Sequence, residues 1–151
     1  MSILDRIENL RMIQANQNEG YVERFERALA SIAELRDPEC IVLLAGFLND
    51  ESDFDELMFS IIHTIEMHED VIYCQELLKA APTLCVHSPR WASILFMRIL
   101  NSDPTCAELL RQVKNAPMST KNAVRILMEQ INQRSEEFVA KTSPVIIATT
   151  S

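Results

Sequence analysis

Glycine is scarce in this chain, at 2 of 151 residues. Phosphate-binding loops such as the P-loop and the dinucleotide fingerprint need several closely spaced glycines, so both kinds of nucleotide site are excluded. Apolar residues also never run uninterrupted for the roughly 20 positions that a membrane-spanning helix requires, and the first residues contain no signal-peptide core. We therefore expect a cytoplasmic protein that does not enter a membrane.

Positive charge is in short supply as well. The 14 Lys and Arg residues are outnumbered by 22 Asp and Glu residues, which gives a net charge of -8 and a pI of about 4.9. Binding to nucleic acid through its phosphates needs a basic surface, so we expect no direct contact with nucleic acid and none with an anionic membrane.

Residues that carry catalytic or metal chemistry are equally sparse. The 4 cysteines form no Cys-x-x-Cys pair, and the 3 histidines have neither zinc-site spacing nor a Ser or Cys partner nearby in the sequence. We therefore expect no catalytic residue, no metal and no cofactor, and a chain that is not an enzyme. A hydrolase with a site built from scattered carboxylates is an alternative, which a deep pocket with converging polar groups would favour.

What the chain does contain is apolar residues at helical spacing along nearly its whole length, without a competing alternation typical of strands. This pattern predicts an all-α fold. Side chains that cap helices mark five starts: Asp37, Ser88 and Asp103, each directly before a proline, then Asp53 with Glu56 three residues later, and Ser119.

About eight helices are predicted, and short links between them favour antiparallel pairs. The pairs are expected to form a small curved stack of the HEAT kind, with a compact helical bundle as the alternative. We expect a single helical domain over residues 1–142 and a flexible tail over 143–151, although Val145, Ile146 and Ile147 could instead dock on the domain. The predicted helices span residues 3–16, 19–36, 38–49, 53–67, 69–80, 89–101, 104–115 and 120–141.

The acidic residues are concentrated in one segment. Residues 37–78 contain eleven acids and no Lys or Arg, whereas the rest of the chain holds eleven acids and fourteen bases. The segment therefore carries a charge of -11 and the flanks carry +3. Such a run is compatible with a solvated face, but we favour a docking surface that attracts a basic partner.

The predicted helix 53–67 has two distinct faces. Phe54, Leu57, Met58, Ile61, Ile62 and Ile65 form one core-facing stripe. The opposite side gathers Asp55, Glu56, Phe59, His63 and Glu66. An aromatic side chain surrounded by charge is typical of protein recognition. The alternative is a central helix buried on both sides, with His63 hydrogen-bonded inside the protein. The candidate partner-binding residues are Asp50, Glu51, Asp53, Asp55, Glu56, Phe59, His63, Glu66, Glu69 and Asp70.

The residues from Asp55 to Glu66, followed by Tyr73, Leu77, Leu78, the run Ser88-Pro89-Arg90-Trp91-Ala92 and the run from Arg98 to Asn101, resemble an all-helical family of bacterial immunity proteins. That family belongs to contact-dependent growth inhibition and related polymorphic toxin systems, and the resemblance covers residues 37–115. The landmarks that match are His63, Glu66, Trp91, Arg98 and Asn101, and we interpret them chiefly as fold-defining. Arg98 lies two turns beyond Trp91 and is a candidate to pair with the acidic segment.

The resemblance implies a cytosolic antitoxin that binds the C-terminal toxin domain of a sibling cell one to one and blocks its active site. In such systems the toxin is often a nuclease, frequently one that acts on tRNA, and a basic nuclease would suit an acidic inhibitor. The alternative function is a small helical-repeat adaptor that binds other cellular proteins, with little dependence on salt.

Overall fold

The structure is a computed structural model that describes residues 1–150. Over that range the chain is helical and has no strand, so the predicted all-α class is confirmed. No helix within the described range is both long and apolar enough to cross a membrane. The elements are α1 (Ile3–Gln14), α2 (Tyr21–Glu34), α3 (Glu39–Ala45), α4 (Asp55–Ile65), α5 (Asp70–His87), α6 (Pro89–Leu100), α7 (Asp103–Val113), α8 (Met118–Arg134), the 3-10 turn η1 (Glu136–Phe138) and α9 (Val139–Thr149).

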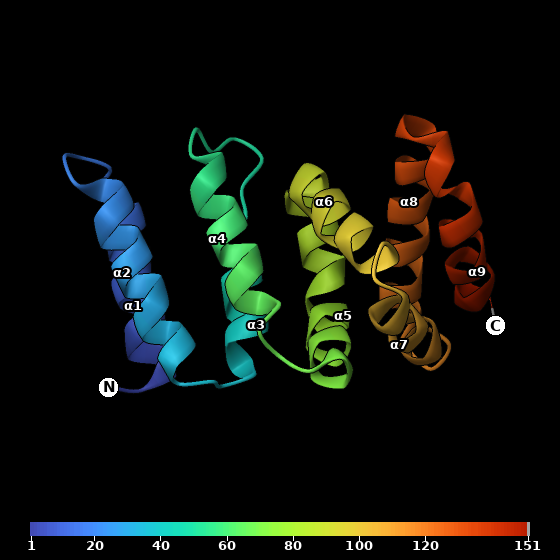
Figure 1. The fold of residues 1–151 in the computed structure, drawn as a ribbon, viewed down its shortest axis with the longest axis horizontal. Coiled ribbons are helices and arrows are strands. Elements are labelled where there is room, and N and C mark those ends of the chain that lie inside the picture. Colours follow the sequence, from blue (N-terminus) through green and yellow to red (C-terminus); the bar gives the residue numbers. More distant parts are fainter. Residues whose placement is uncertain (151) are drawn as a thin grey trace.

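Consecutive helices form antiparallel pairs that stand side by side in a row, with the two termini at opposite ends (Figure 1). Packing passes from one pair to the next: α1 packs on α3, α3 on α5 and α5 on α7, while α2 packs on α4 and α6 on α8. The predicted stack of pairs agrees with this arrangement. Its likeness to HEAT repeats and its curvature remain predictions.

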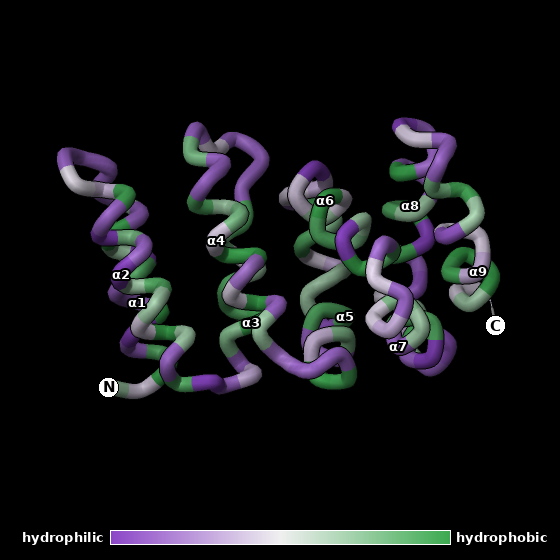
Figure 2. The backbone as a smooth tube through the Cα atoms, in the orientation of Figure 1, coloured by the Kyte–Doolittle hydropathy of each residue, from purple (hydrophilic) through white to green (hydrophobic). Residues whose placement is uncertain are grey.

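Hydrophobic and hydrophilic residues alternate along the helices (Figure 2), and the buried hydrophobic residues of α1 to α9 form one core cluster that runs the length of the row. In α2, Phe25, Leu29 and Ile32 are buried at three- and four-residue spacing. Trp91 and Phe96 of α6 are completely buried. Large side chains of this kind supply most of the stabilising free energy, roughly 1.5–3 kcal/mol for each one removed from water.

Helix α5 is longer than predicted, because it continues through Pro82 to His87. A proline inside a helix leaves the carbonyl four residues earlier without its usual N–H donor. Here that carbonyl belongs to Leu78, and the Thr120 hydroxyl of α8 donates a hydrogen bond to it at 3.4 Å. A side chain forty-two residues away thus replaces the missing donor, which the local sequence does not indicate.

The C-terminal region also differs from the prediction. The expected helix 120–141 is divided at Ser135 into α8 and α9, and the predicted domain boundary at 142 falls inside α9. The expected tail is helical as far as Thr149, because Val145 and Ala148 are buried where α9 packs on α7 and α8. Thr142 also donates a hydrogen bond to Asn132 of α8 at 2.6 Å. Residue 151 of the predicted tail lies outside the described residues.

Four of the five predicted helix starts are shifted: α3 and α7 have Pro38 and Ser102 at the N-cap, the starts of α4 and α8 also differ, and only Ser88 holds its predicted place. The capping box of Asp53 and Glu56 is not formed, since α4 begins at Asp55 and the Ser52 hydroxyl instead accepts a hydrogen bond from the Phe54 N–H. Helix α8 begins at Met118, one residue before the expected cap. At neither start does the N-cap residue form a side-chain capping hydrogen bond.

Candidate functional site

The outward face of α4 is the one that the sequence singled out. Leu57, Met58, Ile61, Ile62 and Ile65 are at most 2% exposed and face the core. Asp55, Glu56, Phe59 and His63 are exposed on the other side, and we refer to these four as the α4 surface. His63 therefore contacts solvent, and the alternative of a helix buried on both sides is wrong.

Phe59 is a large apolar side chain that is exposed but held in place. Phe59 is 36% exposed, and its ring meets the buried Trp91 ring edge to face, with the centroids 5.1 Å apart. The Arg90 guanidinium lies 4.9 Å from the centroid of the Trp91 ring and 3.5 Å from the Asp55 carboxylate. An aromatic ring fixed in this way loses little conformational entropy when a partner covers it.

The loop between α3 and α4 is tied to the start of α6. The two carboxylate oxygens of Asp50 accept hydrogen bonds from the backbone N–H groups of Arg90, at 2.9 Å, and Trp91, at 3.0 Å. The Ser88 hydroxyl, which sequence places as the cap of α6, instead donates to the Leu48 carbonyl at 2.7 Å. Asp50 therefore caps α6 from a distant part of the chain and has a role inside the protein.

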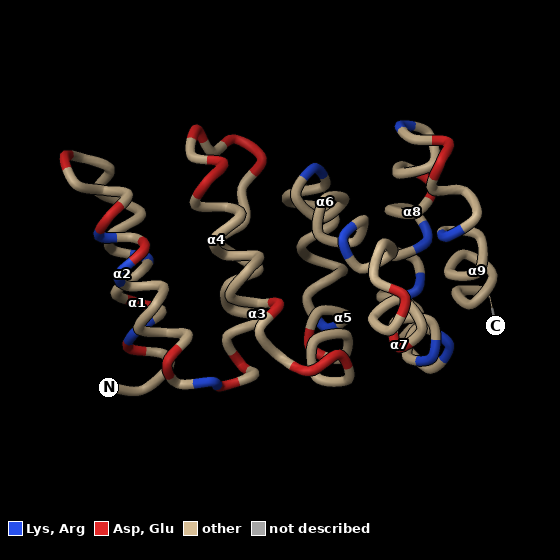
Figure 3. Tube along the Cα trace, viewed as in Figure 1, with Lys and Arg blue, Asp and Glu red and all other residues tan. Residues whose placement is uncertain are grey.

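The candidate acids lie in two places (Figure 3). We call the acids in and after the α3–α4 loop the loop group, and those between α4 and α5 the turn group. The loop group ends at Glu56 in the first turn of α4 and the turn group begins at Glu66, so ten residues, or about 15 Å along the helix, separate them. This exceeds the Debye length of about 8 Å at physiological salt, so the groups act as separate electrostatic features. The loop group is Asp50, Glu51, Asp53, Asp55 and Glu56, and the turn group is Glu66, Glu69 and Asp70.

Two members of the turn group are engaged within the protein. Arg98 donates two hydrogen bonds to the Glu66 carboxylate, both at 2.8 Å, and this contact raises the pKa of the Arg98 guanidinium. The Thr105 hydroxyl donates to Asp70 at 2.8 Å. Arg98 thus pairs with the acidic segment, as its position in the sequence suggested.

The loop group has more free charge. Glu51, Asp53 and Glu56 are exposed, and their carboxylates have no ion pair or hydrogen bond with any residue in the described part of the chain. These three surround the first turn of α4, close in sequence to Phe59. An acidic patch next to a fixed aromatic ring is the arrangement that this surface offers to a partner.

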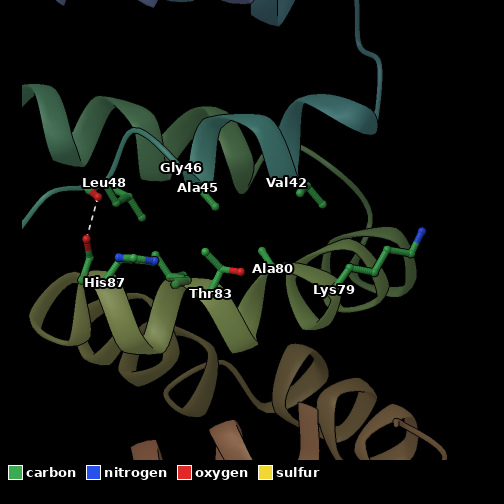
Figure 4. A pocket seen from close by; sticks show the side chains of 10 residues that line it. Val42, Ala45, Gly46, Leu48, Lys79, Ala80, Thr83 and His87 are labelled. Atoms are coloured by element: carbon green, nitrogen blue, oxygen red, sulfur yellow. Dashed lines mark hydrogen bonds between the residues drawn. The ribbon is translucent and has the colours of Figure 1, made fainter. Parts of the chain in front are cut away.

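One of the hollows in the surface offers little chemistry. A pocket of about 230 Å³ between α3 and α5 has mainly apolar walls, with His87 and Lys79 as its titratable residues (Figure 4). Within residues 1–150 no group of three His, Cys, Asp or Glu side chains comes together as a metal site would require. Burial raises the pKa of the Cys40 thiol to about 11, which disfavours the nucleophilic thiolate there.

A comparison with protein families decides what kind of protein carries this surface. The family described as Immunity protein 30 matches residues 9–109, which is two thirds of the chain. The chain belongs to the Immunity protein 30 family. It is therefore an immunity protein, an antitoxin that binds a toxin, as the resemblance implied. Searches of curated proteins and of solved structures found no match.

The match of the Immunity protein 30 family extends beyond the resemblance at the N-terminal side, because it begins inside α1 and includes all of α2. It ends within α7, at residue 109. All the candidate partner-binding residues, together with Trp91, Arg98 and Asn101, fall inside it. Asn101 accepts a hydrogen bond from the Lys141 ammonium of α9 at 2.9 Å and so ties the matched region to the last helix.

Sequence reasoning missed Arg90. It contacts both Asp55 and Trp91, yet it is thirty-five residues from Asp55 and next to a Trp assigned to the core. Because residues 37–78 contain no Lys or Arg, a cation that pairs with their acids must come from elsewhere in the chain, and the sequence alone does not indicate which one. A possible signal was the residue's place in the first turn of α6, where a long side chain projects toward the neighbouring pair.

Proposed function

We propose that this immunity protein neutralises its toxin by one-to-one binding in the cytoplasm, through the loop group and the α4 surface, without catalysis. The single observation that carries the proposal is the set of three unpaired carboxylates, Glu51, Asp53 and Glu56, next to the fixed and exposed ring of Phe59. Charge of this kind accelerates association, and a rigid aromatic ring supplies affinity at the centre of an interface.

We place the turn group at the periphery of the same proposed interface. A standard interface buries about 800 Å² on each partner, a patch of about 30 Å across, which is wider than the 16 Å or so of α4. One toxin domain centred on Phe59 therefore covers His63 and reaches Glu66, Glu69 and Asp70 as well. Because Glu66 and Asp70 are already engaged, they contribute less to long-range attraction than the loop group does.

We propose further that the toxin is a nuclease that acts on tRNA or other RNA and that the acids cover its active site. A nuclease binds phosphate groups with a basic surface, and carboxylates placed on that surface occupy the position of the phosphates. The net charge of -8 supports this choice of partner.

The first experiment is coexpression with the toxin domain from the neighbouring reading frame, read out by growth, by degradation of tRNA and by the mass of the purified complex. The test variant is the triple change Glu51→Gln, Asp53→Asn and Glu56→Gln. We expect its association rate at low salt to fall at least tenfold, while the wild-type rate declines steeply as salt is added.

A matched triple change at exposed acids of α8 and η1, Glu129→Gln, Glu136→Gln and Glu137→Gln, removes the same charge far along the row from α4. Equal association rates for the two triple variants would contradict the role of the loop group. Binding that is insensitive to salt would favour the adaptor instead. The change Phe59→Ala adds a test of affinity, with an expected loss of about 2 kcal/mol that appears mainly as faster dissociation.

A further inference from the structure

A polar pocket of about 410 Å³ lies beside the Glu66–Arg98 ion pair, where the end of α4 meets the starts of α5 and α7 and the end of α6. This volume falls within the range of about 300–1,000 Å³ typical of sites that bind small groups. The α4 surface does not include it, and its walls differ in chemistry from the apolar pocket between α3 and α5. Its lining residues are Glu66, Asp70, Tyr73, Arg98, Ile99, Asn101, Ser102 and Thr105.

Tyr73 is the unusual member of this lining. Its side chain is 96% buried, since only 4% is exposed, and its hydroxyl has no hydrogen-bond partner among residues 1–150. Burial, followed by the nearby Glu66 carboxylate, raises the pKa of the phenol well above its usual range, so the hydroxyl stays neutral. A buried hydroxyl without a partner is costly, which points to a group that the free protein lacks.

The other polar atoms define what that group is. Glu66 and Asp70 bring two negative charges and Arg98 one positive charge, so these three charged walls carry a net charge of -1. Lys141 of α9 donates to the amide oxygen of Asn101 in the lining and forms no ion pair with Glu66 or Asp70 in the described chain. The charge of the walls therefore favours a cationic group.

The hydrogen bonds distinguish between two kinds of cation. Both oxygens of Glu66 already accept from Arg98, and one oxygen of Asp70 accepts from Thr105. No carboxylate in the pocket therefore offers two unoccupied oxygens to the planar fork of a guanidinium. The acceptors that remain, the second Asp70 oxygen and the Tyr73 hydroxyl, are separate points, and a compact ammonium with three donors matches them better.

We propose that this pocket binds the primary ammonium of a lysine side chain presented by the toxin, with Asp70 and Tyr73 as its hydrogen-bond acceptors. The proposal rests on the proposed function for the identity of the partner, and it adds a specific site to an interface that the loop group attracts by charge. The ammonium donates a hydrogen bond to the oxygen of the Tyr73 hydroxyl, an atom that has no partner in the described part of the free protein.

The pocket is tested without the toxin by titrating the protein with n-butylammonium chloride, an ammonium on a four-carbon chain, at constant ionic strength. We expect saturable changes in the amide NMR signals of Asp70, Tyr73 and Thr105. Butylguanidinium should bind at least threefold more weakly, and butanol should cause no saturable change. If butylammonium shifts do not saturate, or if they map elsewhere, the proposal is wrong.

Two variants examine the acceptors. Asp70→Asn should weaken butylammonium binding about tenfold, because it removes the charge but keeps an oxygen for Thr105. Tyr73→Phe should weaken it about fivefold and leave the urea midpoint of unfolding unchanged or higher, because a hydroxyl without a partner is lost. The matched controls, Asp53→Asn and Tyr21→Phe, should not alter binding. Unchanged binding in both test variants overturns the proposal.

The same variants separate this inference from the proposed function. In a complex with the toxin, Tyr73→Phe should raise the dissociation rate about fivefold and leave the association rate unchanged, since a neutral hydroxyl does not steer. If the protein binds butylammonium but does not neutralise the toxin, the proposed function is wrong and the proposed ammonium site still stands. Neutralisation without butylammonium binding would refute the pocket alone.

Discussion

Replacing Asp50 by alanine tests whether a residue of the acidic segment serves the fold. Its two carboxylate oxygens accept hydrogen bonds from the N–H groups of Arg90 and Trp91, at 2.9 and 3.0 Å, in the first turn of α6. Loss of a capping side chain costs about 0.5–2 kcal/mol, and loss of a negative charge at a helix N-terminus adds about 0.3–1 kcal/mol. In the alanine variant water can bind the Arg90 N–H, which is exposed, but it reaches the Trp91 N–H less well. We therefore expect the free energy of unfolding to fall by about 2 kcal/mol.

Urea denaturation followed by helical circular dichroism measures this loss, with an unchanged slope as evidence that the folded state is retained. For a chain of this length, about 2 kcal/mol corresponds to a fall in melting temperature of about 4–8 °C. Asp50→Asn, which keeps one acceptor oxygen, should lose about half as much. The control Asp53→Ala changes an exposed acid without a partner and should stay within about 0.5 kcal/mol of wild type. Equal losses for the two alanine variants would refute the capping role.

Three further outcomes are expected. Val145→Ala should destabilise the protein by about 1–2.5 kcal/mol in the same assay because it leaves a cavity under α9, whereas Ile147→Ala, at a position 67% exposed, should have little effect. Hydrogen bonds from Arg111 and Gln112 lower the pKa of the Glu108 carboxyl to about 2. The stability that this carboxylate contributes is therefore present above about pH 4.5 and lost as the pH falls through 2. NMR titration of the Arg111→Gln variant should show a higher pKa for Glu108. Burial raises the pKa of the Cys40 thiol from 9.0 to about 11. The stability that the buried neutral thiol contributes is therefore complete below pH 9 and lost as the pH rises through 11. Iodoacetamide should alkylate Cys40 much more slowly in the folded protein than in the protein unfolded by urea.

The parts of the fold that the sequence predicts are those decided by local spacing. The two faces of α4 follow from residues three and four apart, so the helical pattern places Phe59 and His63 outside and Ile61 inside without knowledge of any other helix. Helix α5 shows the limit of this reasoning. Pro82 indicates a break, and the donor that Thr120 supplies to Leu78 comes from another helix.

The sequence indicates which residues make up the candidate site, but not which residues of other helices they contact. The decisive contacts of Asp50 with Trp91, and of Glu66 with Arg98, join residues that are 41 and 32 positions apart. Such pairs depend on how successive helix pairs are stacked, and a single sequence carries no direct signal of that register. Arg98 was a reasonable candidate only because it lies on nearly the same helix face as Trp91.

The division of the acidic segment has a simple geometric cause. A run of forty-two residues is longer than one helix, so in an antiparallel stack it must cross the molecule and turn back, and its acids gather at both ends of α4 (Figure 3). Charges at the turn between α4 and α5 meet Arg98 and Thr105 there, whereas those in the exposed loop before α4 have Arg90 as their cation. Only three of the eleven acids form an ion pair in the described part of the chain, Asp55, Glu66 and Glu76, so most of the charge of the segment stays available for attracting a toxin. Association should therefore slow steeply as salt is added to the wild-type protein, and less steeply in the triple loop variant.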